Sequence, residues 1–139
     1  MATDQQQSPD QLMSIDDVDA IAAALQLYID GVAEADTAKL AEAFHPDAQI
    51  YGAIGGQRLD MPIATFFEHV AEHPADVDGT FAARITSVVQ AGDAAGAIVV
   101  EENHLGTLSF VDFFTLCRGD GRWRIVNKTF AHTAGAMAQ

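Results

Sequence analysis

Two runs of alternating residues near the carboxyl end dominate the hydrophobic pattern of this chain. Residues 110–117 and 122–130 are rich in β-branched and aromatic side chains, and an Asp-Gly turn lies between them. This combination is typical of a β-hairpin. Successive strand residues point to opposite faces, and in the first run both faces are apolar. A single carboxylate, Asp112, interrupts one of these faces.

Three earlier segments carry the pattern of amphipathic helices, with apolar residues recurring at every third or fourth position. The predicted helices span residues 15–33, 37–45 and 61–72. Ser14, Asp36 and Asp60 stand just before them, where a side-chain oxygen can accept a hydrogen bond from the first free backbone amides. We therefore expect these three residues to be helix N-caps.

The remaining apolar segments predict strands. They span residues 48–54, 80–90 and 94–104 and lead into the hairpin. Helices that come first and strands that follow indicate an α+β fold. We expect three helices to cover the concave face of a curved, mostly antiparallel sheet. The predicted organisation is a disordered tail over 1–13, one domain over 14–132 and a flexible tail over 133–139.

The chain is strongly acidic. Its 139 residues include 20 Asp and Glu but only 7 Lys and Arg, which gives a formal net charge of −13. Such a surface repels phosphate groups, so neither nucleic acid nor an anionic membrane is an expected partner. The first 11 residues lack the features of a signal peptide, so the expected location is the cytoplasm. Cys117, the single cysteine, is expected to be a small buried side chain.

The order of elements and three motifs resemble the nuclear transport factor 2-like superfamily. The motifs are Phe-His-Pro-Asp-Ala at 44–48, Val-Asp-Phe-Phe-Thr-Leu at 111–116 and Asp-Gly-Arg-Trp-Arg-Ile-Val-Asn-Lys at 120–128. Within the superfamily the "putative lumazine-binding" family is most similar, and the polyketide-cyclase-like and ketosteroid isomerase families are its relatives. The resemblance covers about residues 14–132 and implies a cone-shaped fold with a pocket. Because this fold hosts both enzymes and non-enzymes, the resemblance implies no single function.

The ketosteroid isomerase resemblance implies roles for individual residues. The oxyanion hole of that family uses a Tyr late in the first helix and a protonated Asp on a central strand. Tyr28 and Asp112 occupy the matching positions. The catalytic base of the family falls on Gly52, which has no side chain. Classical ketosteroid isomerisation is therefore not expected.

Two hairpin registers remain open. A three-residue loop over 119–121 would set Asp112 opposite Lys128, whereas a loop of even length would set Asp112 opposite Asn127. The first is preferred because it pairs a carboxylate with an ammonium on an apolar face. Asp112 is then either one half of a structural ion pair or a polar anchor at the floor of the pocket.

Two further side chains are candidates for catalysis. Glu102 continues the face of Ile98 and Val100 and could supply the missing base, whereas Glu101 falls on the opposite face. The alternative for Glu102 is a solvated charge at the rim. His45 is either a catalytic residue or simply the end of a helix.

No metal site and no cofactor are expected. His69 and His73 are four residues apart on one predicted helix, but we expect both to face solvent. The glycines near residue 55 are not followed by the Lys-Ser/Thr pair of a phosphate-binding loop.

Three functions fit these observations. The first is a cofactor-independent isomerase, lyase, dehydratase or cyclase acting on a small apolar carbonyl compound. The second is a small-ligand-binding domain without turnover, and the third is a dimeric structural domain with a filled cone. The candidate catalytic residues are Asp112, Tyr28, His45 and Glu102. The expected pocket lining is Phe44, Tyr51, Phe66, Val100, Phe114, Lys128 and Phe130.

The preferred register also predicts a homodimer. It clusters Val111, Phe113, Trp123 and Ile125 on the convex side of the sheet. Monomers seldom leave an apolar patch of that size exposed, and a twofold partner would cover it.

Overall fold

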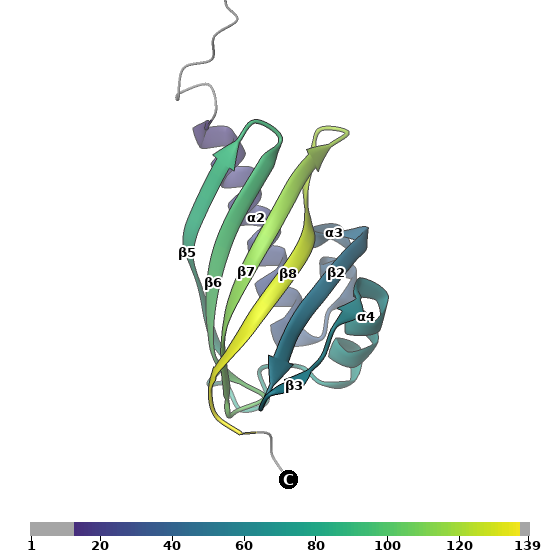
Figure 1. Ribbon diagram of the computed structural model, residues 1–139, viewed down its shortest axis with the longest axis vertical. Helices are drawn as coiled ribbons and strands as arrows, with labels where there is room; N and C mark the ends of the chain where they lie inside the picture. Colours follow the sequence, from purple (N-terminus) through teal and green to yellow (C-terminus); the bar gives the residue numbers. More distant parts are fainter. Residues whose placement is uncertain (1–12, 137–139) are drawn as a thin grey trace, which may run out of the picture.

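The structure is a computed structural model and describes residues 13–136. Three helices lie on one face of a curved sheet whose strand order is β3-β2-β8-β7-β6-β5, with β4 also paired to β2 (Figure 1). The strands pair antiparallel except for β2 and β8, which are parallel. The elements are α2 (Ile15–Glu34), α3 (Thr37–Ala43), β2 (Phe44–Ile54), β3 (Gln57–Arg58), β4 (Met61–Pro62), α4 (Ile63–Glu72), β5 (Ala82–Ala91), β6 (Ala94–His104), β7 (Leu108–Gly119) and β8 (Arg122–Ala134). The predicted α+β fold is confirmed.

The predicted caps hold for two of the three helices. The Ser14 hydroxyl accepts a hydrogen bond from the Asp17 amide at 3.0 Å, and the Asp36 carboxylate accepts from two amides of α3. Asp60 does not cap α4, because Pro62 holds that position. The Asp60 carboxylate instead accepts from a backbone amide of β2. No helix within residues 13–136 is long and apolar enough to cross a membrane.

Two element boundaries differ from the prediction. Strand β2 begins at Phe44, four residues early, and its pairing with β8 is irregular between Phe44 and Gln49. Pro46 lies in this stretch and lacks the amide that a regular ladder requires, which explains why the strand was not predicted there. Strand β8 runs to Ala134, two residues beyond the predicted end of the domain. The predicted N-terminal tail lies outside the described residues except for Met13.

The core fills the space between α2, α3, α4 and the concave face of the sheet. At its centre the ring of Tyr28 from α2 packs edge-on against Phe44 and Phe114, with ring centroids 5.9 and 5.0 Å apart. The apolar stripe of α2 is buried against these rings, as its spacing predicted. A tyrosine hydroxyl is thereby carried from the helix to the inner surface of the sheet.

The β7–β8 hairpin contains a bulge that changes its register. Its turn has two residues, Asp120 and Gly121, whose positive φ angles of 53° and 74° suit a tight hairpin. Farther along, Thr115 pairs with Asn127 but Leu116 pairs with Ile125, so residue 126 is an extra residue on β8. Beyond the bulge, residue 112 pairs with residue 130 and residue 114 with residue 128. Neither predicted register is correct.

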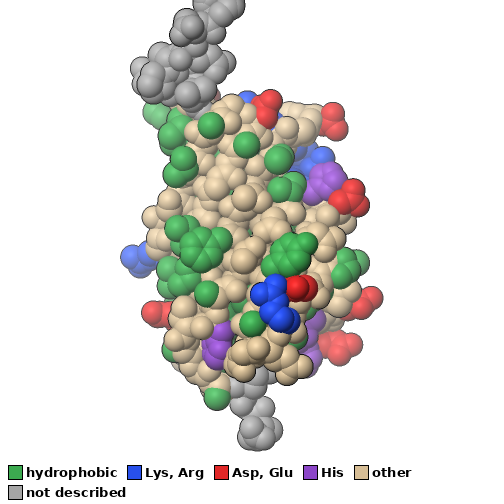
Figure 2. Space-filling model, in the orientation of Figure 1, with side chains coloured by type: hydrophobic (Ala, Val, Ile, Leu, Met, Phe, Trp, Pro, Cys, Tyr) green, Lys and Arg blue, Asp and Glu red, His purple; other side chains and the backbone are tan. Residues whose placement is uncertain are grey.

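The bulge also reverses the faces of β8, since side chains alternate with a period of two. Trp123 and Ile125 are therefore buried in the core, and the prediction that they lie on the convex face is wrong. Val111 and Phe113 do lie on that face, where Phe113 is 48% exposed. Cys117 is exposed there too, contrary to expectation. Hydrophobic side chains are spread over this open face, and most charged ones lie toward its edges (Figure 2).

Candidate functional site

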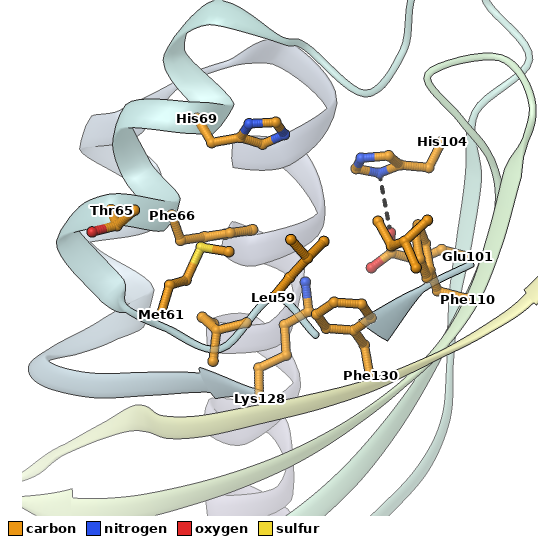
Figure 3. Close-up of a pocket in the computed structure, with 12 residues that line it drawn as sticks. Leu59, Met61, Thr65, Phe66, His69, Glu101, His104, Phe110, Lys128 and Phe130 are labelled. Atoms are coloured by element: carbon orange, nitrogen blue, oxygen red, sulfur yellow. Dashed lines mark ion pairs between the residues drawn. The ribbon is translucent and has the colours of Figure 1, made fainter. Parts of the chain in front are cut away.

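A pocket of about 210 Å³ opens between α4, β2 and the inner surface of the sheet. Its walls are mostly apolar, but five polar side chains reach it, two of them imidazoles that point toward each other (Figure 3). The volume is below the usual range for drug-sized ligands, so the pocket suits a small molecule. The apolar lining is Ile50, Ile54, Leu59, Met61, Phe66, Phe110 and Phe130, and the polar lining is Thr65, His69, Glu101, His104 and Lys128.

Tyr28 joins two buried carboxyl groups at the wall of this pocket. Its hydroxyl oxygen lies 2.6 Å from Glu101 Oε2 and 2.9 Å from Asp112 Oδ2. Each of the two acidic residues is only 1% exposed. The three groups come from α2, β6 and β7, so the contact forms only when the helix packs on the sheet.

The number of hydrogens shared by Tyr28, Glu101 and Asp112 determines which carboxyl group is protonated. A tyrosine hydroxyl has one hydrogen and can donate to only one carboxylate, so the other carboxyl must carry its own proton. Burial, and then the charge of Glu101, hold the pKa of Asp112 well above its usual value. Asp112 is therefore the protonated acid and donates to the Tyr28 oxygen. Tyr28 in turn donates to Glu101, and the 2.6 Å distance is typical of a hydrogen bond to a carboxylate.

Burial also keeps the tyrosine neutral. Removal from water, and then the neighbouring carboxyl groups of Asp112 and Glu101, raise the pKa of Tyr28 well above its ordinary value. One oxygen of Asp112, Oδ1, has no hydrogen-bond partner among the described residues. Of the three residues, only Glu101 lines the pocket. Tyr28 and Asp112 lie behind it and hold it in place.

Lys128 lies on β8 with its side chain directed into the pocket (Figure 3). It is only 7% exposed. Its ammonium lies 4.6 Å from the centroid of the Phe66 ring, 5.0 Å from that of Tyr28 and 5.4 Å from that of Phe130. The expected ion pair with Asp112 does not occur among the salt bridges of the described residues.

His104, at the end of β6, stands beside Glu101. Its Nδ1 lies 3.6 Å from Glu101 Oε1, too far for a hydrogen bond, and has no partner in the described part of the chain. Burial, and then the charge of Lys128, lower the pKa of His104 to about 4. The imidazole is therefore neutral at pH 7, and its contact with Glu101 is not an ion pair. Burial also lowers the pKa of His69, on the opposite wall.

The structure brings only part of the predicted set together. Phe66, Lys128 and Phe130 line the pocket, whereas Phe44 and Phe114 belong to the closed core. Tyr51 and Val100 point to the outer face, because Ile50 and Val99 beside them point inward. His45 lies away from this pocket, and its Nδ1 accepts a hydrogen bond from the Asp47 amide.

The prediction that Glu102 faces the pocket is wrong. Glu102 is exposed, and Glu101 is the buried residue. The inward side of β6 carries the small residues Ala95 and Ala97, while the larger Ile98 points outward. The expectation followed the larger side chains and therefore chose the wrong face. The small size of the two alanines is the signal that could have identified Glu101.

Gly52 lies where the family resemblance places a base. A Cβ at this position would collide with the ring of Phe130. Phe130 thus occupies the space that a side chain at residue 52 would need. The acid that the pocket does contain, Glu101, comes instead from β6, two strands beyond β8.

Metal ligands do not gather in the described residues: no group of three His, Cys, Asp or Glu side chains is placed to hold an ion. The rings of His69 and His73 are 4.7 Å apart, but no carboxylate completes a site with them. The ionisable side chains that reach the pocket are His69, Glu101, His104 and Lys128.

Comparison with known proteins agrees with this geometry. A family model described as "Putative lumazine-binding" matches residues 16–131. The chain belongs to this family. Its structural neighbours place the family in the nuclear transport factor 2-like superfamily, as the sequence motifs indicated.

Two similar crystal structures are of nuclear transport factor 2-like proteins of unknown function. For the protein from Methylobacillus flagellatus KT, the TM-score is 0.79 and the sequence identity is 34%. The match covers 88% of this chain and 96% of that protein. For the protein from Shewanella baltica OS155, the TM-score is 0.78 and the identity 27%, over 87% and 97%. A curated relative, "Aldolase FrzH" from Cladobotryum sp., is 28% identical over 118 residues, which are 81% of this chain and 88% of the relative.

Proposed function

We propose that this protein is an enzyme that moves a proton at the carbon next to a carbonyl group, in a small apolar aldehyde or ketone. The reaction class is that of isomerases, lyases and cyclases that pass through an enol or enamine. The observation that carries the proposal is the carboxylate of Glu101, fixed by the Tyr28 hydroxyl at the wall of an apolar pocket.

Glu101 has the properties of a general base. It lines the pocket, it accepts a single short hydrogen bond, and the proton shared by the buried acids lies on Asp112. A base inside an apolar cavity is poorly solvated and therefore reactive toward a carbon-bound proton. Tyr28 and Asp112 act as positioning residues, since neither lines the pocket.

The negative charge that develops on the carbonyl oxygen needs a positive partner. Tyr28 cannot serve, because its hydroxyl is already bonded to both carboxyl groups. Lys128 is the cation among the residues that line the pocket. A fixed positive charge in a water-poor site stabilises such an oxyanion strongly. Lys128 therefore takes the electrophilic role that the resemblance implied for Tyr28 and Asp112.

The relative named as an aldolase supports this reaction class. An aldol addition forms a carbon–carbon bond next to a carbonyl and requires removal of a proton from the neighbouring carbon, and in aldol cleavage a proton returns to that carbon. Its identity to this chain is 28% over 118 residues. The likeness supports proton transfer next to a carbonyl but does not identify the substrate.

The test is hydrogen exchange in D₂O, followed by proton NMR, with butanal and cyclohexanone as probes. The wild type should exchange the protons next to the carbonyl faster than buffer alone. Glu101→Gln should slow the catalysed exchange by about 10²-fold or more, the usual contribution of a general base. Glu102→Gln is the matched control, since its neighbouring carboxylate is exposed and outside the pocket. Equal rates in the wild type and Glu101→Gln would refute the proposal.

A binding protein without turnover is the second candidate, and the mostly apolar lining of the pocket favours it. In that case cyclohexanone should bind equally well to the wild type and to Glu101→Gln. Neither protein should then exchange its protons above the buffer rate. NMR titration and the exchange assay, run on the same samples, separate the two functions.

A further inference from the structure

We propose that Lys128 is a covalent anchor that forms an iminium ion with the carbonyl carbon of a small aldehyde or ketone. The proposal rests on the proposed function for its substrate class and adds a bond that the acid–base reading does not require.

The side chain of Lys128 is buried, and its amine has no polar partner in the described part of the chain. The side chain is 7% exposed, and within the described residues its nitrogen takes part in no hydrogen bond or salt bridge. Its neighbours are the rings of Tyr28, Phe66 and Phe130. Ring faces attract an ammonium, but they replace only part of the hydration that it loses. The nitrogen therefore reaches the pocket with its bonding capacity free for a ligand.

The other lysine shows what an ordinary structural lysine looks like in this protein. The chain contains two lysines, Lys39 and Lys128. The ammonium of Lys39 donates to a carboxylate oxygen of Glu34 at 3.0 Å, on the surface. A lysine that serves only as a charge has such an acceptor at hand. Lys128 has an apolar cavity in front of it instead.

The same pocket holds the group needed to move the protons. The Lys128 ammonium and the Glu101 carboxylate line the same pocket without forming a salt bridge, so one proton passes from the ammonium to the carboxylate across the pocket, and the neutral amine then attacks the carbonyl carbon. A C–N bond forms as the carbonyl π bond becomes a hydroxyl, which gives a carbinolamine. Glu101 returns the proton to that hydroxyl, which leaves as water while the C=N bond forms. In sum, an ammonium and a carbonyl compound yield an iminium ion and water, and Glu101 is again a carboxylate able to remove the neighbouring proton.

The cavity selects the kind of carbonyl compound. Seven of its twelve lining residues are apolar, and its volume of about 210 Å³ admits only a small molecule. Glu101 repels a substrate that carries its own carboxylate next to the reacting carbon. The pocket therefore fits an uncharged aldehyde or ketone with a short hydrocarbon chain or ring.

Reductive trapping tests the bond directly. The full chain is incubated with butanal and sodium cyanoborohydride, which reduces an iminium to a stable secondary amine, and the modified residue is located by peptide mass spectrometry. Lys128 should be labelled at least tenfold faster than Lys39. Lys39→Arg should leave labelling of Lys128 unchanged, whereas Lys128→Arg and Lys128→Met should lose it. Thermal unfolding followed by circular dichroism shows which of these variants are folded.

The outcomes separate this inference from the proposed function. Labelling confined to Lys39 and the amino terminus, or equal rates at the two lysines, would overturn the covalent role. If Lys128 stays unlabelled while the wild type exchanges deuterium and Glu101→Gln does not, the acid–base function stands and the covalent step falls. If Lys128 is labelled but no probe exchanges, the covalent anchor stands and the proposed function falls.

Discussion

Replacing Tyr28 by Phe should destabilise the protein by about 2–4 kcal/mol. The change keeps the ring and its edge-on packing against Phe44 and Phe114 but removes the hydroxyl that bridges Glu101 and Asp112. A hydrogen bond to a charged group contributes about 1.5–3 kcal/mol and a neutral one about 0.5–1.5 kcal/mol. The sum is an upper estimate, because the two carboxyl groups can rearrange around the lost hydroxyl.

The assay is equilibrium unfolding in urea at pH 7. For a domain of this size the free energy of unfolding falls by about 1–3 kcal/mol per molar urea. The midpoint should therefore drop by roughly 1–2 M. Tyr51→Phe is the matched control, because Tyr51 is the only other tyrosine and is 41% exposed on the outer face. Its free energy of unfolding should stay within about 0.5 kcal/mol of the wild type.

The comparison between the two tyrosines decides the result. If both variants unfold at the same urea concentration, the hydroxyl of Tyr28 contributes nothing that depends on its two acidic partners. The assignment of the proton to Asp112 and the positioning of Glu101 would then both be wrong.

Three further predictions concern protonation and assembly. The pKa of His104 is lowered to about 4 in the folded protein, against about 6.5 when unfolded, so the unfolded chain binds more protons between these values. The free energy of unfolding therefore falls by about 2–3 kcal/mol as pH drops from about 6.5 toward 4. His104→Gln should flatten this dependence, which urea unfolding at pH 7 and pH 5 would measure. Asp112→Asn should cost less than about 1 kcal/mol, because an amide can donate to Tyr28 as the protonated acid does. Its cost should shrink further as pH rises above about 4, the ordinary pKa of an aspartate, because the folded protein then holds a proton that the unfolded chain releases; the same cost at pH 4 and pH 7 would contradict this. We also expect a homodimer through the open sheet face that carries Val111 and Phe113, so sedimentation at micromolar concentration should show twice the 14.8 kDa chain mass and Phe113→Ser should shift it toward the monomer. A 14.8 kDa species of the wild type would exclude the dimer.

The helices could be predicted because their signals are local. A 3.6-residue apolar period and a capping Ser or Asp specify a helix without reference to the rest of the chain. The three predicted helices agree with α2, α3 and α4 to within two residues at each end. The position of Tyr28 on the inner stripe of α2 follows from the same period.

The acidic side of the site could not be predicted with the same rules. Which face of β6 is inward depends on how the whole sheet packs, and hydrophobicity alone favours the outer residues Ile98 and Val100 over Ala95 and Ala97. That preference exchanged the roles of Glu101 and Glu102. Lys128 lines the pocket as predicted, but the strand partner of Asp112 and the inward face of Trp123 and Ile125 depended on an extra residue in β8 that no turn signal reveals. Both errors concern tertiary packing, which overrides local pattern in strands.

The extra residue at position 126 divides β8 into one part that packs in the core and another part that lines the pocket. On the side of the turn, odd-numbered residues such as Trp123 and Ile125 face inward and complete the hydrophobic core. On the other side, even-numbered residues such as Lys128 and Phe130 face inward and form the pocket. Substitutions on one side can therefore alter the chemistry without repacking the other. A one-residue deletion here would leave the strand intact but turn the amine of Lys128 outward to solvent.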